Sequence, residues 1–233
     1  MHKETDLIPN LSPNLVLEEE AVSVRLNGSY LLTAMISPHN KEEFVTGYLF
    51  TEELISSLAD IESLRIEKSS VSVLTTNPFQ ISKRRMVLSG CGSSSSFLDE
   101  KHLRVISRSS QIQKSIIHKS VCALPPISAA LWNNEGCLFQ CTDIGIHSAC
   151  VTCIGYGLLH AIDFSSCMLA ISARIATDVV RVALLCGIPL IASSSVSTRL
   201  AITIAEKMGL CIIGSVGTDD MIIYADKNLI INS

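Results

Sequence analysis

The chain has 233 residues, of which 48% are hydrophobic and 17% charged, and its formal net charge is −4. This composition permits a substantial apolar core in one large or two smaller domains, and it excludes global disorder and a basic nucleic-acid-binding surface. No apolar segment resembles a secretory signal or reaches membrane-spanning length without a charge or a proline, so we expect a cytoplasmic protein that binds neither membrane nor nucleic acid.

The first half of the chain is predicted to form a small α+β unit. Apolar residues alternate on both sides of an Asn-Gly pair within residues 21–36, which is the strongest local signal for a β-hairpin. Acidic residues followed by apolar residues at helical spacing predict a helix over residues 41–55. Alternating stretches predict two further strands over residues 61–67 and 71–75.

Residues 77–98 are predicted to form a long loop that carries the sequence SGCGSSSS around Cys91. Glycine on both sides of this cysteine and serine after it bury little surface, so the thiol should be exposed. A basic trio, residues 83–85, precedes it, and exposure near positive charge favours the thiolate, which is the nucleophilic form. An incidental surface cysteine is the alternative interpretation.

The second half is predicted to form an α/β sheet covered by helices on both faces, because buried strands alternate with helices. The predicted helices cover residues 99–118, 127–132, 148–162, 175–186 and 197–208. The predicted strands cover residues 135–141, 167–172, 188–192, 210–214 and 222–224. We place the boundary between the halves near residues 105–115, which gives domains of residues 1–108 and 109–233.

The nine cysteines are an odd number and lie mostly in apolar runs, which favours reduced core thiols over a disulfide framework. His147, Cys150 and Cys153 follow one another at steps of three, a spacing that would also suit one side of a zinc site. Cys137 and Cys141 could supply further ligands, but an extended strand would hold them apart. The spacing therefore favours structural core cysteines, and we expect no metal.

Polar residues follow several predicted strands of the second half, at the edge where α/β folds bind ligands. Asp143 and His147 flank a turn glycine between a strand and a helix, where they could contact a ligand or simply cap the helix. Arg174 follows the next strand and could clamp a phosphate or pair with Asp178. The segment 214–220 could line the same crevice or form a plain hairpin.

Together these residues resemble the FdhD family of formate dehydrogenase accessory sulfurtransferases over nearly the whole chain. The blocks DIGIH, SARIATDVV and LLCGIPLIA carry the resemblance by their order and spacing. It implies a small α+β N-terminal part and a C-terminal three-layer α/β/α domain similar to cytidine deaminases, without their zinc. A nucleoside deaminase itself is excluded, because P-C-x-x-C is absent and H-x-E occurs only in residues 2–4.

The resemblance implies that Cys91 takes persulfide sulfur from a cysteine desulfurase and passes it to a molybdenum bis(molybdopterin guanine dinucleotide) cofactor for formate dehydrogenase. The Cys91 thiolate would attack the outer sulfur of the donor persulfide and later surrender it. A homodimer without an intrinsic metal is implied as well. The cofactor would bind as a substrate among Asp143, His147, Arg174, Ser215, Val216, Gly217, Thr218, Asp219 and Asp220.

The chain departs from the family pattern at several positions. Ser94 replaces the second cysteine of the loop motif, and Ile127 and Ile146 replace a histidine and an arginine. Asp219 and Asp220 would repel a phosphate unless a cation lay between them. The sequence therefore predicts a sulfur carrier, with a non-catalytic paralogue that chaperones a cofactor or an enzyme as the alternative.

Overall fold

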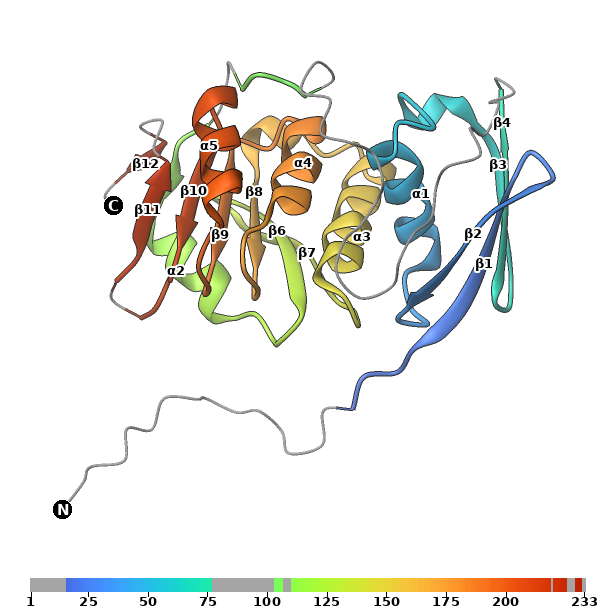
Figure 1. Cartoon of the computed structure of the whole chain (residues 1–233), viewed down its shortest axis with the longest axis horizontal. Coiled ribbons are helices and arrows are strands. Elements are labelled where there is room, and N and C mark those ends of the chain that lie inside the picture. The colour runs from blue at the N-terminus through green and yellow to red at the C-terminus, as the bar shows by residue number, and fades with distance from the viewer. Residues whose placement is uncertain (1–15, 77–102, 107–109, 219, 226–228, 232–233) are drawn as a thin grey trace.

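The computed structural model describes most of the chain, namely residues 16–76, 103–106, 110–218, 220–225 and 229–231 (Figure 1). Cys91, Asp219 and the loop predicted over residues 77–98 lie outside the described residues. The helices are α1 (Lys41–Thr51), α2 (Lys114–Cys122), α3 (Ile146–Leu159), α4 (Thr177–Cys186) and α5 (Arg199–Met208). The strands are β1 (Glu20–Leu26), β2 (Ser29–Ile36), β3 (Ile61–Glu67), β4 (Ser70–Thr75), β5 (Ile112–Gln113), β6 (Ser128–Asn133), β7 (Gly136–Thr142), β8 (Met168–Ile171), β9 (Leu190–Ser193), β10 (Cys211–Gly214), β11 (Ile222–Ala225) and β12 (Ile230–Ile231).

The N-terminal half forms a four-stranded sheet in the order β2-β1-β4-β3. Its first two strands are the predicted hairpin, and both turn residues, Asn27 and Gly28, have the positive φ that this turn requires. Alternate side chains of β1, those of Val22, Val24 and Leu26, are buried beneath α1. The remaining predicted strands and the helix of this half are likewise confirmed within a few residues at their ends.

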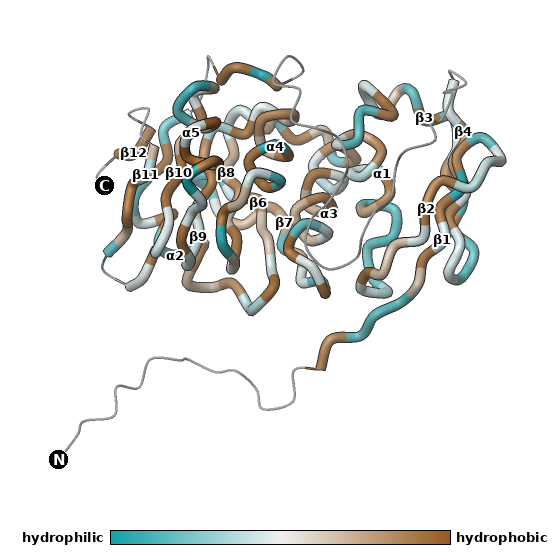
Figure 2. Tube along the Cα trace, viewed as in Figure 1, coloured by the Kyte–Doolittle hydropathy of each residue, from teal (hydrophilic) through white to brown (hydrophobic). Residues whose placement is uncertain are grey.

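The C-terminal half is built on a six-stranded sheet in the order β11-β10-β9-β8-β6-β7. Helices α3, α4 and α5 cover one face and α2 the other, which confirms the predicted mixed α/β layering. The strands β8, β9 and β10 are buried along their whole length and mostly apolar (Figure 2), as expected of strands that are covered on both faces. No helix in the described ranges is both long and apolar enough to cross a bilayer.

The two halves meet where α1 crosses α3 through a pair of glycines. A Cβ atom added at Gly155 would overlap the carbonyl oxygen of Glu43, and one at Gly47 would overlap the carbonyl oxygen of Val151. The two backbones are therefore closer than any larger residue permits. Apolar side chains from both halves form one continuous buried cluster around this crossing.

Two sequence predictions of secondary structure are wrong. Of residues 127–132, predicted as a helix, all but Ile127 belong to β6 in the interior of the large sheet, where Ala129 to Trp132 are buried. A short apolar run has no periodicity that separates a buried strand from a helix. The helix predicted over residues 99–118 begins only at Lys114. Residues 103–106 are irregular, and the Ile106 N–H donates to the carbonyl of Met208 at the end of α5.

Candidate functional site

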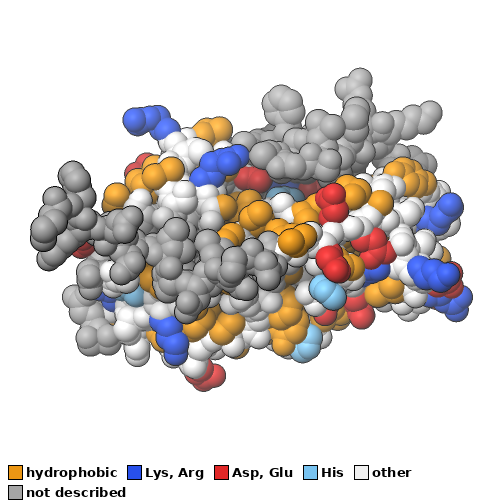
Figure 3. All heavy atoms as spheres, turned by 90° about the horizontal axis from the view of Figure 1, so that it is seen from below, with side chains coloured by type: hydrophobic (Ala, Val, Ile, Leu, Met, Phe, Trp, Pro, Cys, Tyr) orange, Lys and Arg blue, Asp and Glu red, His pale blue; other side chains and the backbone are white. Residues whose placement is uncertain are grey.

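The candidate site lies where four strands of the large sheet end together. Strands β8, β9 and β10 are parallel, and β7 shares their direction because β6 runs antiparallel to both β7 and β8. The loops after these strands therefore meet at one edge, the lower one in Figure 1. Figure 3 views the molecule from this side and shows acidic side chains gathered toward the half that holds the four-stranded sheet.

Asp143 follows β7 and is buried, with 2% of its surface exposed. Its Oδ1 accepts the N–H groups of Ile144 at 2.7 Å and of Ser37 at 3.2 Å, so it joins this edge to the end of the N-terminal hairpin. Burial raises the pKa of the Asp143 carboxyl, against the lowering effect of these amides. The carboxylate thus supports the edge from within and does not face a ligand directly.

His147 lies in the first turn of α3, and its Nδ1 is 3.7 Å from Oδ2 of Asp178 on α4. This nitrogen is buried and makes no hydrogen bond to the part of the chain that the structure describes. Burial lowers the pKa of His147, and the nearby Arg181 lowers it further, while Asp178 opposes both. The imidazole is therefore neutral at pH 7 and retains an unsatisfied polar atom at the site.

The burial of His147 predicts a stability that depends on pH. The unfolded chain binds a proton at this side chain near its ordinary pKa of about 6.5, whereas the folded chain binds it only at lower pH. Stability should therefore fall as the pH drops below about 6.5, by up to about 1.4 kcal/mol per pH unit. Urea unfolding between pH 7.5 and 5 should show a shallower fall for His147→Gln, and equal slopes would contradict this.

Arg174 lies three residues beyond the end of β8, and its side chain is exposed. Across the described ranges it forms no ion pair, because Asp178, its predicted alternative partner, faces His147 instead. Its position is fixed by the backbone, since the neighbouring Ile175 bridges to Ser197 of the next loop. A guanidinium held at a strand end without a competing carboxylate is suited to a phosphate.

The serine-rich loop after β9 connects its neighbours on both sides. The Ser193 hydroxyl donates to the carbonyl of Ala173 at 2.6 Å, in the loop that carries Arg174, and accepts the N–H of Ser195 at 2.9 Å. On the other side, the N–H groups of Ser215 and Val216 donate to the carbonyls of Ser195 and Ser193. These serine contacts align the loops that would hold a ligand.

The loop after β10 contains most of the remaining candidate residues. Val216 is buried, Gly217, Thr218 and Asp220 are exposed, and Ser215 adopts a left-handed conformation with φ of 52°. Two residues of α2 that the sequence did not point to also reach this loop, because both contact the carbonyl of Gly217: His118 and Cys122. Their spacing of four on a helix is common, and no motif connects them to residue 217.

The cysteines of α3 are core residues, as the spacing predicted. Cys150 and Cys153 have no exposed surface, and burial raises the pKa of both thiols. Cys141 is also buried, which raises its pKa to about 12, whereas Cys137 on the same strand is exposed. The three buried thiols, those of Cys141, Cys150 and Cys153, are therefore protonated and inert toward sulfur chemistry.

A cavity of about 360 Å³ lies at the opposite edge of the large sheet. Its lining includes Phe164, which lies just before β8, and Cys186, which ends α4. The cavity is therefore far from Asp143 and His147. We place the candidate site by its convergent polar groups and not by this cavity.

Comparisons with known proteins agree with this architecture. The model of the FdhD/NarQ family matches residues 17–231. The sulfur carrier protein FdhD of Wolinella succinogenes is 26% identical to this chain, over 91% of this chain and 80% of the relative. The sulfur carrier protein FdhD of Bacillus pumilus is 28% identical, over 90% of this chain and 87% of the relative. A solved structure from Desulfotalea psychrophila, of a protein assigned as a formate dehydrogenase accessory protein, covers 92% of this chain and 90% of its own. Its TM-score of 0.75 at 18% identity shows a shared fold.

Proposed function

The chain belongs to the FdhD/NarQ family, and from this premise we propose that it is a sulfur carrier in the maturation of formate dehydrogenase. The observation that carries the proposal is the match along residues 17–231, together with relatives named as sulfur carriers that align over most of their length. The sequence motifs had predicted this family.

Cys91 is the proposed carrier thiol. Its thiolate attacks the outer sulfur of a cysteine persulfide on a desulfurase, a new S–S bond forms, and the donor cysteine leaves as a thiolate. The described cysteines of the core cannot replace it, because burial keeps them protonated. Cys91 stands 12 residues before Leu103 in the sequence. Covalent geometry therefore limits the distance of Cys91 from Leu103 to about 40 Å.

The acceptor would be the molybdenum bis(molybdopterin guanine dinucleotide) cofactor, bound as a substrate at the edge where β7 to β10 end. Three strands separate β7 from β10, so the edge between Asp143 and Ser215 extends about 19 Å. This length suits an elongated dinucleotide better than a small metabolite. Arg174 would bind phosphate and the loop 215–220 a guanine nucleotide end, while Asp143 and His147 support the edge from beneath.

The partners follow from the same chemistry. A cysteine desulfurase would supply the sulfur, formate dehydrogenase would receive the sulfurated cofactor, and the reaction would take place in the cytoplasm on a homodimer. The second candidate function is a chaperone that binds the cofactor or the enzyme without moving sulfur. Two substitutions favour it: Ser94 in place of the second loop cysteine, and the exposed carboxylate of Asp220 in the loop after β10.

Binding of a guanine nucleotide tests the cofactor site. Arg174→Ala should weaken the affinity for GDP by about 1 to 3 kcal/mol, because a charge-assisted hydrogen bond to phosphate is lost. Isothermal titration would measure it, with Arg65→Ala as the control, since Arg65 is exposed on β3 of the other sheet. An affinity that does not change would remove Arg174 from the site.

A further inference from the structure

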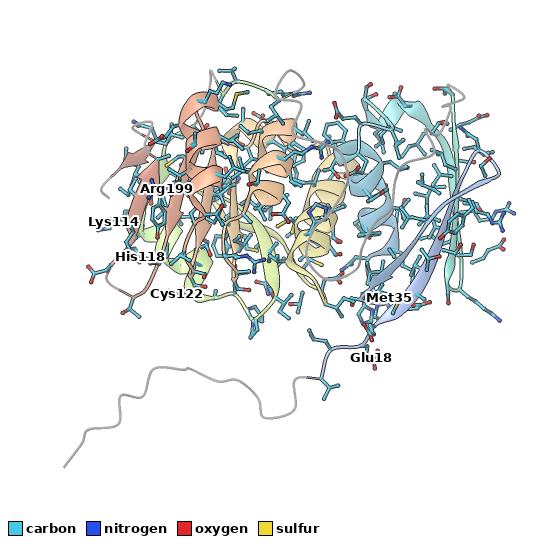
Figure 4. All side chains as sticks on the ribbon, viewed as in Figure 1. Glu18, Met35, Lys114, His118, Cys122 and Arg199 are labelled. Carbon is cyan, nitrogen blue, oxygen red and sulfur yellow. The ribbon has the colours of Figure 1, made fainter. Side chains whose placement is uncertain are left out.

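Helix α2 has an apolar face that packs against the large sheet and a polar face that contacts the loop after β10. Ile117 and Val121 pack beneath the large sheet in the same buried cluster as Val216 of the loop after β10. His118 and Cys122, one helical turn apart, lie on the side that faces this loop (Figure 4). The helix thus contacts the loop both through its apolar core and through polar side chains.

Both polar side chains meet the same atom. Nδ1 of His118 is 2.8 Å from the carbonyl oxygen of Gly217, and Sγ of Cys122 is 3.5 Å from it. A carbonyl oxygen only accepts hydrogen bonds, so Nδ1 of His118 carries the proton and donates. A well-placed N–H···O bond at this distance is the stronger of the two, because a thiol is a weak donor.

Gly217 is the residue through which the loop contacts His118 of α2. The preceding residues, Ser215 and Val216, are already bound through their N–H groups to the loop after β9. Gly217 is exposed, and its N–H donates to the carbonyl of Asp220 within the same loop, so the contact of Gly217 with α2 is made through its own carbonyl. Because a peptide group is planar, a fixed Gly217 carbonyl also fixes the direction of the N–H group that follows it.

We propose that His118 is a positioning residue that holds the loop after β10 in its ligand-binding conformation by fixing the Gly217 carbonyl. The proposal rests on the proposed function, in which this loop binds the guanine nucleotide end of the cofactor. A loop held in place before binding does not have to be ordered at the expense of affinity. His118 itself touches the loop and not the ligand.

Substitutions at position 118 separate the hydrogen bond from the rest of the side chain. In Asn the amide nitrogen is attached at the same branch point as Nδ1 of histidine, whereas in Gln it lies one carbon further out. His118→Asn therefore keeps a donor for the Gly217 carbonyl, and His118→Gln and His118→Ala do not. Lys114→Ala, one turn earlier on α2, is the control.

Two measurements test the proposal: GDP affinity by titration, and amide hydrogen exchange of residues 215–218 in the unliganded protein. We expect His118→Ala and His118→Gln to bind GDP about 3- to 10-fold more weakly and to exchange faster, with His118→Asn and Lys114→Ala close to wild type. Equal affinity in all variants, or an Asn variant as impaired as the Ala variant, would overturn it.

The exchange measurement also distinguishes the role of His118 from the nucleotide-binding role of the loop. If the wild-type protein does not bind GDP, the proposed nucleotide role of the loop is wrong, whatever His118 does. If the loop amides exchange equally fast in His118→Ala and in the wild-type protein, His118 does not hold the loop, whether or not GDP binds.

Discussion

Incubated with a cysteine desulfurase and labelled cysteine, the protein should gain one sulfur atom on Cys91, and Cys91→Ser should gain none. The expected loss is complete, because the hydroxyl of serine cannot form a persulfide. Mass spectrometry of the peptide that contains residue 91 measures the added sulfur directly. This change has the largest expected effect on activity, since it removes the atom that carries the cargo.

Two other cysteines provide matched controls. Cys122 and Cys137 are exposed in the described structure and would react first if any accessible thiol sufficed. Cys122→Ser and Cys137→Ser should therefore load sulfur at Cys91 as the wild type does. Sulfur that appears on Cys122 or Cys137 in place of Cys91 would contradict the assignment of Cys91 as the carrier thiol. A wild-type protein that gains no sulfur at all would favour the chaperone over the carrier.

Replacing Gly155 with alanine should cost about 3 kcal/mol of the free energy of unfolding. The added Cβ would overlap the backbone of Glu43, which cannot rotate away as a side chain could, so α1 and α3 must move apart. Thermal or urea unfolding would measure the loss.

The same helix contains the control for this prediction. At Gly145, the N-cap of α3, a new Cβ would meet nothing closer than the Ser148 hydroxyl at 3.8 Å. Gly145→Ala should therefore cost at most about 1 kcal/mol, the effect of alanine as a poorer N-cap residue. If the two variants unfolded alike, the close approach of α1 and α3 would not be a source of stability.

The sequence predicted most elements of the fold because their patterns are local. The Asn-Gly pair determined the hairpin, and the buried runs around Leu169, Ile191 and Ile212 indicated strands covered on both faces. The failures have tertiary causes. The run that became β6 is short and apolar, and residues 103–106 are not helical because the Ile106 N–H bonds instead to the carbonyl of Met208 at the end of α5.

The site was predictable only in part. Strand order placed Asp143, Arg174 and the loop after β10 at one edge, as expected from residues that follow parallel strands. The sequence did not show that Asp143 is buried or that Arg174 lacks an ion pair with Asp178. The contact between His118 and Gly217 joins residues 99 positions apart, and such a contact depends on the packing of α2 against the sheet.

The glycine crossing of α1 and α3 has a consequence for sulfur transfer. It packs the two sheets into one body. Thr76 and Leu103, which border the segment with Cys91, both belong to this body, because the Thr76 N–H donates to the Asp60 carbonyl and Leu103 is part of the buried cluster. Sulfur carried on Cys91 would therefore stay covalently attached to the molecule that carries the candidate cofactor site. Under the proposed function, sulfur transfer to a cofactor bound on the same molecule would be intramolecular, at a local concentration on the order of millimolar, and would need no second collision.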